Sequence, residues 1–146
     1  MNETARLVRD FLKLALEHPE GPATAAAFDR TFQFALSDDA PFYVQLTGGA
    51  LTVAEGDCGL DWAGRDWERA TCVHTSVRVL REIMAGRRIV SEAFFDGELG
   101  FAPQRAATRH LDAAVIVTWF YTLVRLAREQ TEARARERYL ADLGVS

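Results

Sequence analysis

A helical spacing of hydrophobic residues marks the most informative part of the sequence. Its apolar members lie three or four positions apart and are Val77, Leu80, Ile83 and Met84. Charged residues occupy most of the positions between them, and Gly86 follows shortly after as a residue that suits the end of a helix. The pattern predicts an amphipathic helix that ends at Gly86, with Leu80 and Met84 on its buried side.

The residues that follow predict a short helix and then a strand. Ser91 is placed to cap a helix of one to two turns that contains Phe94 and Phe95, and Gly97 is placed to end it. From 98 to 102 the large apolar residues alternate with other residues, which is the period of a strand, and a proline follows. The order is therefore helix, glycine, connector, short helix, glycine and strand.

Four segments before this region show the alternation of half-buried strands. They are residues 31–36, 42–46, 51–55 and 67–75. Gly48 and Gly49 suit a tight hairpin between the second and third segments, so the first three strands are expected to form an antiparallel meander. The alternation places Phe34 and Leu46 on the faces that we expect to be buried.

A helix is also predicted at the N-terminal end, where apolar residues form a broad stripe over positions 7–15. Asn2 or Thr4 is placed to cap this helix, and the pair His18-Pro19 marks its end. A second, short helix is expected over residues 23–28, before the first strand. We expect the apolar stripe to lie on the sheet.

The most hydrophobic segment lies near the C-terminal end. A helix that starts near His110 or Asp112 is apolar on nearly every side as far as Ala127, so it should be buried on more than one side. A bilayer span needs roughly 20 apolar residues, and this run is shorter and is interrupted by Arg125. It is therefore not expected to cross a membrane. The charged residues 128–138 predict either an exposed continuation of the helix or a frayed tail.

An ordered set of short motifs resembles a known family. The motifs are residues 80–86, Ala93-Phe94-Phe95-Asp96-Gly97-Glu98-Leu99, residues 32–36, and residues 42–46 with Gly48-Gly49. In this order, over about two-thirds of the chain, they resemble the sterol carrier protein 2-like (sterol transfer) family. The sequence departs from the family pattern at two places: Gly97-Glu98-Leu99 replaces the usual Gly-Lys-Leu, and Gly100-Phe101-Ala102-Pro103 replaces a Lys-Ile-x-Gly-Asp strand.

The element order and the resemblance give one expected fold. It is an α+β fold in which a mixed sheet of about five strands has helices on one face, with the last strand added after a helical crossover. The resemblance implies a hydrophobic cavity that binds, and in some members transfers, a lipid, sterol, fatty acid or polyketide-like molecule without covalent chemistry. The residues that we expect to line it are Phe34, Leu46, Leu80, Met84, Phe94, Phe95, Leu99, Trp119, Phe120 and Leu123. The alternative is that these side chains fill one another's space as ordinary core.

Two other functions stay open at this point. The first is an enzyme of the cyclase, isomerase or hydratase type that uses the same cavity on a polyketide or isoprenoid-like substrate. Its candidate acid or base residues are Asp57, Asp61 and Glu98. The second is an interaction module in which the long C-terminal helix and tail, residues 112–146, dock on a partner or on a second copy. The residues seven positions apart that suggest a homodimer are Leu126, Ala133 and Leu140.

Composition narrows the class of protein and of partner. The 146 residues suit a single domain. With a net charge of −4 and a pI near 5.4, the protein has no broad positive charge to attract nucleic acid, so nucleic acid is not an expected partner.

The first ten residues contain charges and no apolar core, so they are not a signal sequence, and we expect a cytoplasmic protein. Lys13 is the only lysine beside many arginines, which suggests a GC-rich bacterial genome.

No cofactor site or catalytic residue is expected from the motifs. Cys72 and His74 lie two positions apart on a predicted strand and with Cys58 or His110 could form a metal site, but no recognised ligand spacing is present. We therefore expect free thiols and no metal. The basic pair Arg87-Arg88 is expected to be solvated rather than to bind an anionic headgroup.

Overall fold

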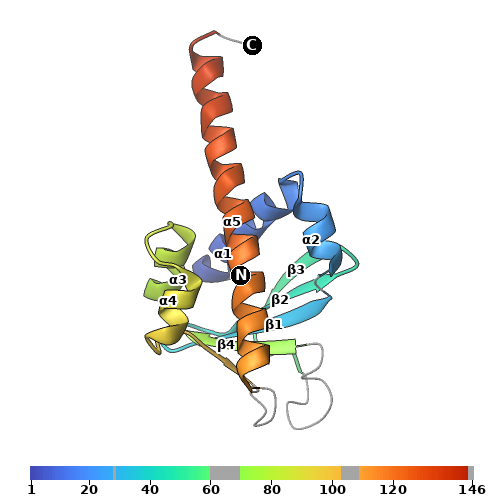
Figure 1. The fold of residues 1–146 in the computed structure, drawn as a ribbon, viewed down its shortest axis with the longest axis vertical. Coiled ribbons are helices and arrows are strands. Elements are labelled where there is room, and N and C mark those ends of the chain that lie inside the picture. Colours follow the sequence, from blue (N-terminus) through green and yellow to red (C-terminus); the bar gives the residue numbers. More distant parts are fainter. Residues whose placement is uncertain (28, 60–69, 103–108, 145–146) are drawn as a thin grey trace.

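The computed structural model describes residues 1–27, 29–59, 70–102 and 109–144, and the side chains of residues 109–119 are outside that description. Within these ranges two helices are followed by four strands, two helices, a fifth strand and a long last helix, and Figure 1 shows their arrangement. In chain order the elements are α1 (Glu3–Glu17), α2 (Gly21–Ala27), β1 (Arg30–Leu36), β2 (Phe42–Thr47), β3 (Ala50–Glu55), β4 (Ala70–Thr75), α3 (Val77–Met84), α4 (Val90–Phe95), β5 (Gly100–Ala102) and α5 (Arg109–Asp142). This order agrees with the one predicted from the hydrophobic spacing.

The strands form one mixed sheet in the order β3-β2-β1-β4-β5. The first three strands make the expected antiparallel meander. Gly48 and Gly49 turn the hairpin between β2 and β3 with φ angles of 59° and 82°, which suit a tight two-residue turn. The last strand, β5, follows two helices and pairs antiparallel with β4. The predicted α+β class, with about five strands in a mixed sheet, is confirmed.

The central pair of the sheet, β1 and β4, is parallel, and the sequence did not indicate this pairing. The register runs from Thr31 beside Ala70 to Leu36 beside Thr75. Parallel neighbours need a long connection, which the meander and residues 56–69 supply. The meander therefore lies on one side of β1, and the strand that leads into α3 lies on the other.

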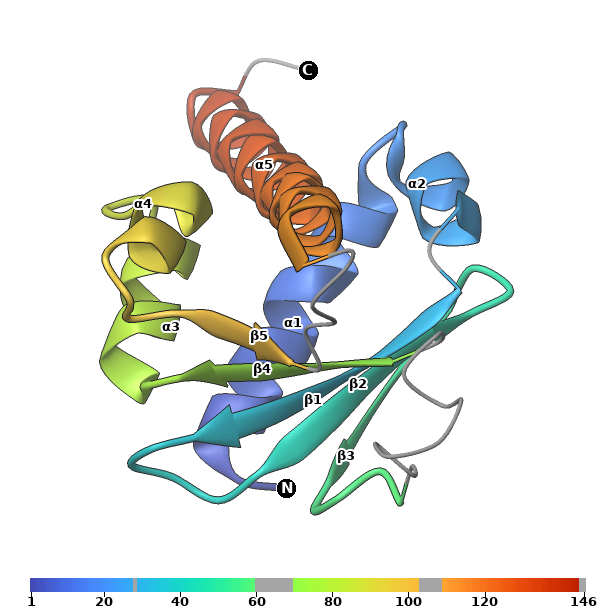
Figure 2. The same ribbon diagram turned by 60° about the horizontal axis from the view of Figure 1, so that its bottom comes forward.

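The helices cover one face of this sheet, as expected. Figure 2 shows α5 crossing over the strands, with α3 and α4 on one side of it and α2 on the other. The covered face presents a layer of buried side chains, which are Phe32, Phe34, Val44, Leu46, Val73 and Phe101. α1 and α5 pack against each other above that layer. The apolar stripe of α1 therefore lies on the sheet side, as its spacing predicted.

Local capping explains where the helices begin. The Asn2 side chain accepts a hydrogen bond from the Ala5 backbone at 2.8 Å, so Asn2, and not Thr4, caps α1. The prediction that Ser91 caps α4 is wrong, because α4 begins one residue after Ile89 and has no side-chain cap. Burial of Val90 fixes that start, since it places the first turn of the helix against the core.

Helix α5 is one continuous helix of 34 residues, about 51 Å long at 1.5 Å per residue. Its middle part carries buried Leu123, Leu126 and Ala127, and its last turns extend beyond the rest of the molecule (Figure 1). The exposed end predicted for residues 128–138 is therefore helical. Within the described ranges, none of the helices combines the length and the hydrophobicity that crossing a membrane requires.

Candidate functional site

An enclosed apolar pocket lies between the covered face of the sheet and three helices. Its free volume is about 50 Å³. The described residues that line it are Val8, Phe11 and Leu12 from α1, Phe32 and Phe34 from β1, Val44 and Leu46 from β2, Leu80, Ile83 and Met84 from α3, Leu99, and Phe120, Leu123 and Val124 from α5. Every one of these side chains is hydrophobic, so the described lining offers no hydrogen-bonding or charged group.

Phe120 of α5 reaches the strands at this pocket. Its ring lies edge-on to Phe32, with 5.1 Å between ring centroids, and edge-on to Phe34 at 6.3 Å. The Phe101 ring lies 5.8 Å away. These separations are those of favourable aromatic pairs. The ring contacts therefore join α5 directly to the sheet.

The walls of the pocket follow from helical spacing. Leu80, Ile83 and Met84 lie on one side of α3 because residues three and four positions apart share a face. Ser76 fixes the start of α3 by accepting a hydrogen bond from the Val79 backbone at 3.2 Å. At the other end, Arg128 of α5 donates to the Met84 carbonyl at 3.3 Å. The Ser76 bond fixes the first turn of α3, and the Arg128 bond ties its last turn to α5.

The structure brings together most of the residues expected to line a cavity. Seven of the ten lie on the pocket: Phe34, Leu46, Leu80, Met84, Leu99, Phe120 and Leu123. Phe94 is half-buried and packs on Phe101 at 5.6 Å, beside the pocket rather than on it. The Trp119 side chain is outside the described residues. The sequence analysis missed the contribution of α1, although the stripe over positions 7–15 carried the signal.

Phe95 was expected to point inward, and this prediction is wrong, because its side chain is 82% exposed. Helix α4 has only six residues and buries Val90 and Ala93. Residue 95 lies two positions after Ala93, which on a helix is nearly the opposite side. Its ring contacts Phe94, 5.3 Å away between centroids, and otherwise faces outward. Two adjacent phenylalanines on so short a helix cannot both face the core.

The candidate acid Glu98 lies outside the pocket and is held by arginines. Its carboxylate accepts hydrogen bonds from Arg88 and, at 3.4 Å, from Arg78. Arg88 also pairs with Asp96 at 2.8 Å, and its side chain is only 15% exposed, so the expectation of a solvated Arg88 is wrong. Partial burial of Arg88 lowers its pKa, but the bonds to Glu98 and Asp96 outweigh this and raise it. The Glu98 carboxylate therefore pairs with two arginines and contributes nothing to the described pocket lining.

Solved structures share this arrangement of sheet, helices and pocket. A structure described as UbiJ-SCP2, a ubiquinone synthesis protein, is 11% identical with a TM-score of 0.59, over 84% of this chain and 94% of its own. A structure of sterol carrier protein 2 is 16% identical with a TM-score of 0.56, over 88% of this chain and 96% of its own. Sterol carrier protein 2 from Yarrowia lipolytica is 13% identical with a TM-score of 0.51, over 85% and 91%.

The chain has the sterol carrier protein 2 fold. The resemblance carried by the motifs is confirmed at the level of the fold, because identities this low show the fold alone. No family model matches the sequence, and no curated protein matches it. Glu98, where the motif departs from the usual lysine, forms the ion pairs with Arg78 and Arg88 that were just described.

The sheet face opposite the pocket of this sterol carrier protein 2 fold carries a buried amide. The Gln33 side chain donates to the carbonyls of Phe42 and Gly56, both at 3.1 Å, and accepts from the Cys58 backbone at 2.7 Å. Its polar atoms are thereby satisfied, which is the usual condition for burying an amide. Gln33 therefore acts as a structural clip that holds the start of the connection to β4.

The two cysteines lie near this clip and are free thiols. Burial raises the pKa of the Cys72 thiol, and the nearby Cys58 and Asp57 raise it further. A raised pKa disfavours the thiolate that metals and nucleophilic reactions require. Cys72 is in no cluster of metal-binding groups among the described residues, and the His110 side chain is outside them.

A second group of potential ligands joins the end of α1 to α5. Ligand atoms of His18, Glu20 and Glu129 lie within 4.8 Å of one another. His18 Nδ1 accepts from the Glu20 backbone N–H at 3.0 Å, so the ring proton is on Nε2, which donates to Glu129 at 2.8 Å. Arg125 also donates to Glu129 at 3.1 Å. No free imidazole lone pair faces the carboxylates, so we interpret the group as a link between helices.

Proposed function

We propose that the protein binds a hydrophobic small molecule, such as a fatty acid, sterol or other lipid-like compound, in the pocket beneath α5. The observation that carries the proposal is the wholly apolar lining contributed by the sheet and by α1, α3 and α5. Removing apolar surface from water favours such binding by roughly 25 cal/mol for each Å². Support also comes from the shared fold, since two of the similar structures are named sterol carrier protein 2.

The pocket must widen to accept such a ligand. Its free volume is about 50 Å³, whereas an apolar cavity of about 150 Å³ accepts a molecule as small as benzene. Phe120 and Met84 are the side chains best placed to move, because both line the pocket and are only partly buried. Methionine adapts easily through its three flexible bonds. The ligand is therefore expected to take the place of the Phe120 ring near the strands.

The described lining favours binding without a reaction. It contains no carboxylate, imidazole, thiol or hydroxyl group that could act as an acid, base or nucleophile. Glu98 is engaged by Arg78 and Arg88, and Asp57 Oδ1 accepts from the Gly59 backbone at 2.7 Å. Asp61, the third candidate, is outside the described residues. Nothing in the described geometry favours the enzyme over the carrier.

Saturable binding of a fluorescent fatty acid or sterol analogue tests the proposal. Leu123→Phe places a larger side chain in the pocket and should weaken binding at least about tenfold. Leu51→Phe makes the same change at a half-buried residue that packs on the core but does not line the pocket, so binding should be retained. Both variants are first checked for folding by circular dichroism.

Mass spectrometry of material extracted from the purified protein identifies the natural ligand. We expect a lipid-like compound to be enriched in the unmodified protein and depleted in Leu123→Phe. Absence of saturable binding by the unmodified protein, together with no enriched compound, would leave a packed core and overturn the proposal. Equal binding by both variants would place the ligand elsewhere on the molecule.

A further inference from the structure

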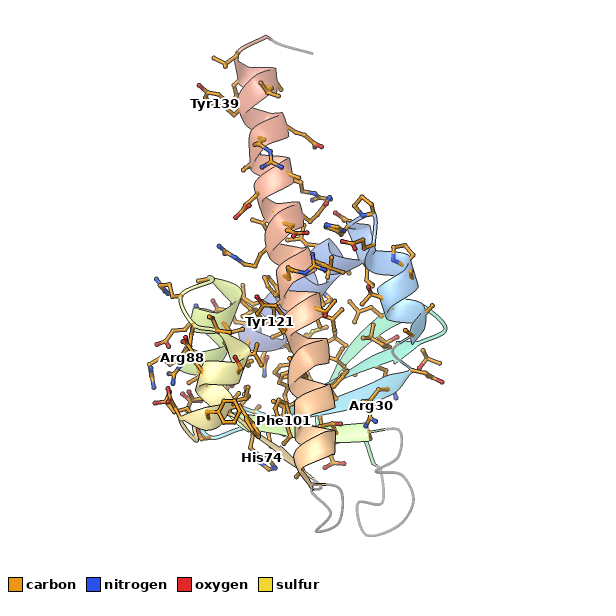
Figure 3. The ribbon with its side chains drawn as sticks, viewed as in Figure 1. Arg30, His74, Arg88, Phe101, Tyr121 and Tyr139 are labelled. Atoms are coloured by element: carbon orange, nitrogen blue, oxygen red, sulfur yellow. The ribbon has the colours of Figure 1, made fainter. Side chains whose placement is uncertain are left out.

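The exposed side of α5 carries an unusual share of the outward-facing hydrophobic side chains. Three of the eight large hydrophobic residues that are exposed within the described ranges lie on this helix, Tyr121, Tyr139 and Leu140, and a fourth, Leu143, follows directly after it. Tyr121 is 50% exposed over the folded domain, and Tyr139 is 64% exposed on the part that extends beyond it (Figure 3). Exposed hydrophobic side chains thus occur both on the domain and on the end of α5 that extends beyond it, which we call the overhang.

Tyr121 and Tyr139 belong to one continuous face. Tyr121 and Tyr139 are separated by 18 positions, which is five turns of an α-helix, so both side chains leave the helix on the same side. The residues between them on this side recur at alternating spacings of four and three. They are Tyr121, Arg125, Arg128, Glu132, Ala135 and Tyr139. This is the spacing of a seam between two packed helices.

The seam expected earlier from Leu126, Ala133 and Leu140 is wrong. Leu126 has no exposed surface and belongs to the core between α5 and the rest of the domain. Ala133 and Leu140 continue this inward-facing side of the helix beyond the domain, where Leu140 is 45% exposed, so the three residues do not form one exposed seam. The seam through Tyr121 and Tyr139 lies on a different side of the helix, which is exposed at both of its ends.

We propose that this face of α5 pairs, antiparallel, with the same face of a second copy of the chain, with the twofold axis near residue 130. Tyr139 then lies opposite the partner's Tyr121, and Glu132 lies opposite the partner's Arg128. The third layer joins Arg125 to the partner's Ala135. Each layer occurs twice because the arrangement is symmetric. The overhang of each copy rests on the domain of the other.

Charge complementarity selects the antiparallel second copy as the occupant. In the antiparallel arrangement Glu132 and Arg128 form opposite-charge layers on both sides of the axis. Arg128 uses one of its five N–H groups to donate to the Met84 carbonyl of its own copy, which leaves others for the partner's Glu132. A parallel arrangement would instead place Glu132 beside Glu132 and Arg128 beside Arg128. Opposite charges across a helix pair set its orientation, and like charges oppose the alternative.

The overhang suits this partner better than a lipid surface. From residue 128 to residue 142 it carries balanced charges, which are Arg128, Arg134, Arg136 and Arg138 against Glu129, Glu132, Glu137 and Asp142. A balanced segment gains no net attraction to anionic lipids. Isolated helices of this length are only marginally stable in water, so a helix that extends from the domain gains most from a partner helix.

Light scattering of the full chain as a function of concentration tests the pairing. We expect the mass to rise from 16.3 kDa to twice that value as the protein reaches high micromolar concentration. Glu132→Arg reverses the charge in the central layers and should weaken the dimer at least about tenfold. Glu137→Arg makes the same change on another side of the same exposed turns and should leave the dimer unchanged.

Cross-linking tests the orientation, in a chain where both native cysteines are replaced by serine. Tyr121 and Tyr139 are about 27 Å apart on their own helix, so a disulfide in the double variant Tyr121→Cys/Tyr139→Cys can form only between copies. We expect a covalent dimer from this variant and none from Tyr139→Cys alone. A covalent dimer from Tyr139→Cys alone indicates a parallel pair and overturns the proposal.

Three further outcomes also contradict it. They are a monomer at every concentration, a dimer that Glu132→Arg does not weaken, and co-sedimentation with vesicles of anionic lipid that Tyr139→Ala abolishes. The last outcome would identify the face as a lipid-binding surface. Ligand binding in the pocket is measured separately, so failure of the dimer and failure of the proposed function are distinguishable.

Discussion

Phe120 is the residue through which α5 contacts the aromatic side chains of the sheet. Its ring packs against Phe32, Phe34 and Phe101, and it reaches them from a helix that the sequence shows only as apolar on nearly all sides. The sequence predicts that Phe120 is buried somewhere. It cannot predict that the ring meets the strands at the pocket, because that depends on where α5 crosses the sheet.

Truncating this residue should separate packing from ligand binding. Phe120→Ala should lower the free energy of unfolding by about 3 kcal/mol, the low end for a phenylalanine in a core, because it is partly buried. It should also strengthen binding of a bulky ligand, since space opens near the strands. Phe95→Ala is the control and should change stability by less than about 0.5 kcal/mol, because Phe95 is exposed. Urea denaturation gives both values, and equal losses for the two variants would contradict the assigned positions.

The errors at residue scale share one physical reason. Phe94 and Phe95 are equally hydrophobic, and a helix of six residues is too short for its spacing to show which one faces inward. Arg88 was expected to be solvated as part of a basic pair. Its acidic partners are Asp96 and Glu98, which lie eight and ten positions further along the chain, after α4. Contacts of this kind appear only once the chain has turned back on itself.

At the scale of elements, local signals were reliable and long-range pairing was not. The hairpin glycines and the alternation of residues 31–55 predicted the meander, because neighbouring strands are joined by short turns. The parallel pairing of β1 with β4 joins residues about 40 positions apart, such as Thr31 and Ala70, and no local pattern specifies it. Period together with capping and terminating residues predicted the helices, and the part of α5 after residue 127 was predicted as either an exposed helix or a frayed tail.

The junction between α3 and α5 places an arginine against Gly86. This glycine has φ of 75°, and a Cβ there would lie 2.6 Å from the Arg128 guanidinium. Gly97 has nearly the same φ, 78°, and nothing within 4 Å of the added atom, so it is a matched control. Gly97→Ala should cost about 1 kcal/mol for the left-handed backbone alone. Gly86→Ala should cost about 1 kcal/mol more in urea denaturation, because the flexible end of Arg128 moves aside and gives up its hydrogen bond to the Met84 carbonyl, and equal costs would show that this bond adds no stability.

The link between α1 and α5 should make stability depend on acidic pH. A hydrogen bond from Arg125 is the main cause that lowers the pKa of Glu129; partial burial opposes it, and His18 adds to the lowering. A carboxyl with a lowered pKa stabilises the fold above the ordinary pKa of glutamate, about 4.3, and loses that contribution as the pH falls through the folded value.

Glu129→Gln should therefore reduce stability near neutral pH, and the difference from the unmodified protein should shrink as the pH falls below about 4. Glu137→Gln, at an exposed glutamate on the same helix, is the control and should show no such pH dependence. Denaturation curves at a series of pH values give both differences. A gap between Glu129→Gln and the unmodified protein that stays constant into acid would exclude the charge of Glu129 as its cause.

At the scale of the whole molecule, the motifs predicted the class and the position of the pocket but not its volume. Which faces meet follows from periodicity, since each element buries its apolar side. The free volume is a small difference between large packed volumes, and a change of one rotamer alters it. A sequence can therefore specify an apolar site under α5 without specifying whether it is open.

A ligand in this pocket should stabilise the entire fold, because its lining comes from α1, β1, β2, α3 and α5 together. A molecule that binds only the folded chain adds about 2.7 kcal/mol when present at 100 times its Kd. For a chain of this size each kcal/mol raises Tm by roughly 2–4 °C, so an increase of several degrees is expected. The increase should disappear in Leu123→Phe and persist in Leu51→Phe and in Glu132→Arg, which changes only the exposed face of α5. Loss of the increase in Glu132→Arg would show that the ligand binds between copies rather than beneath α5.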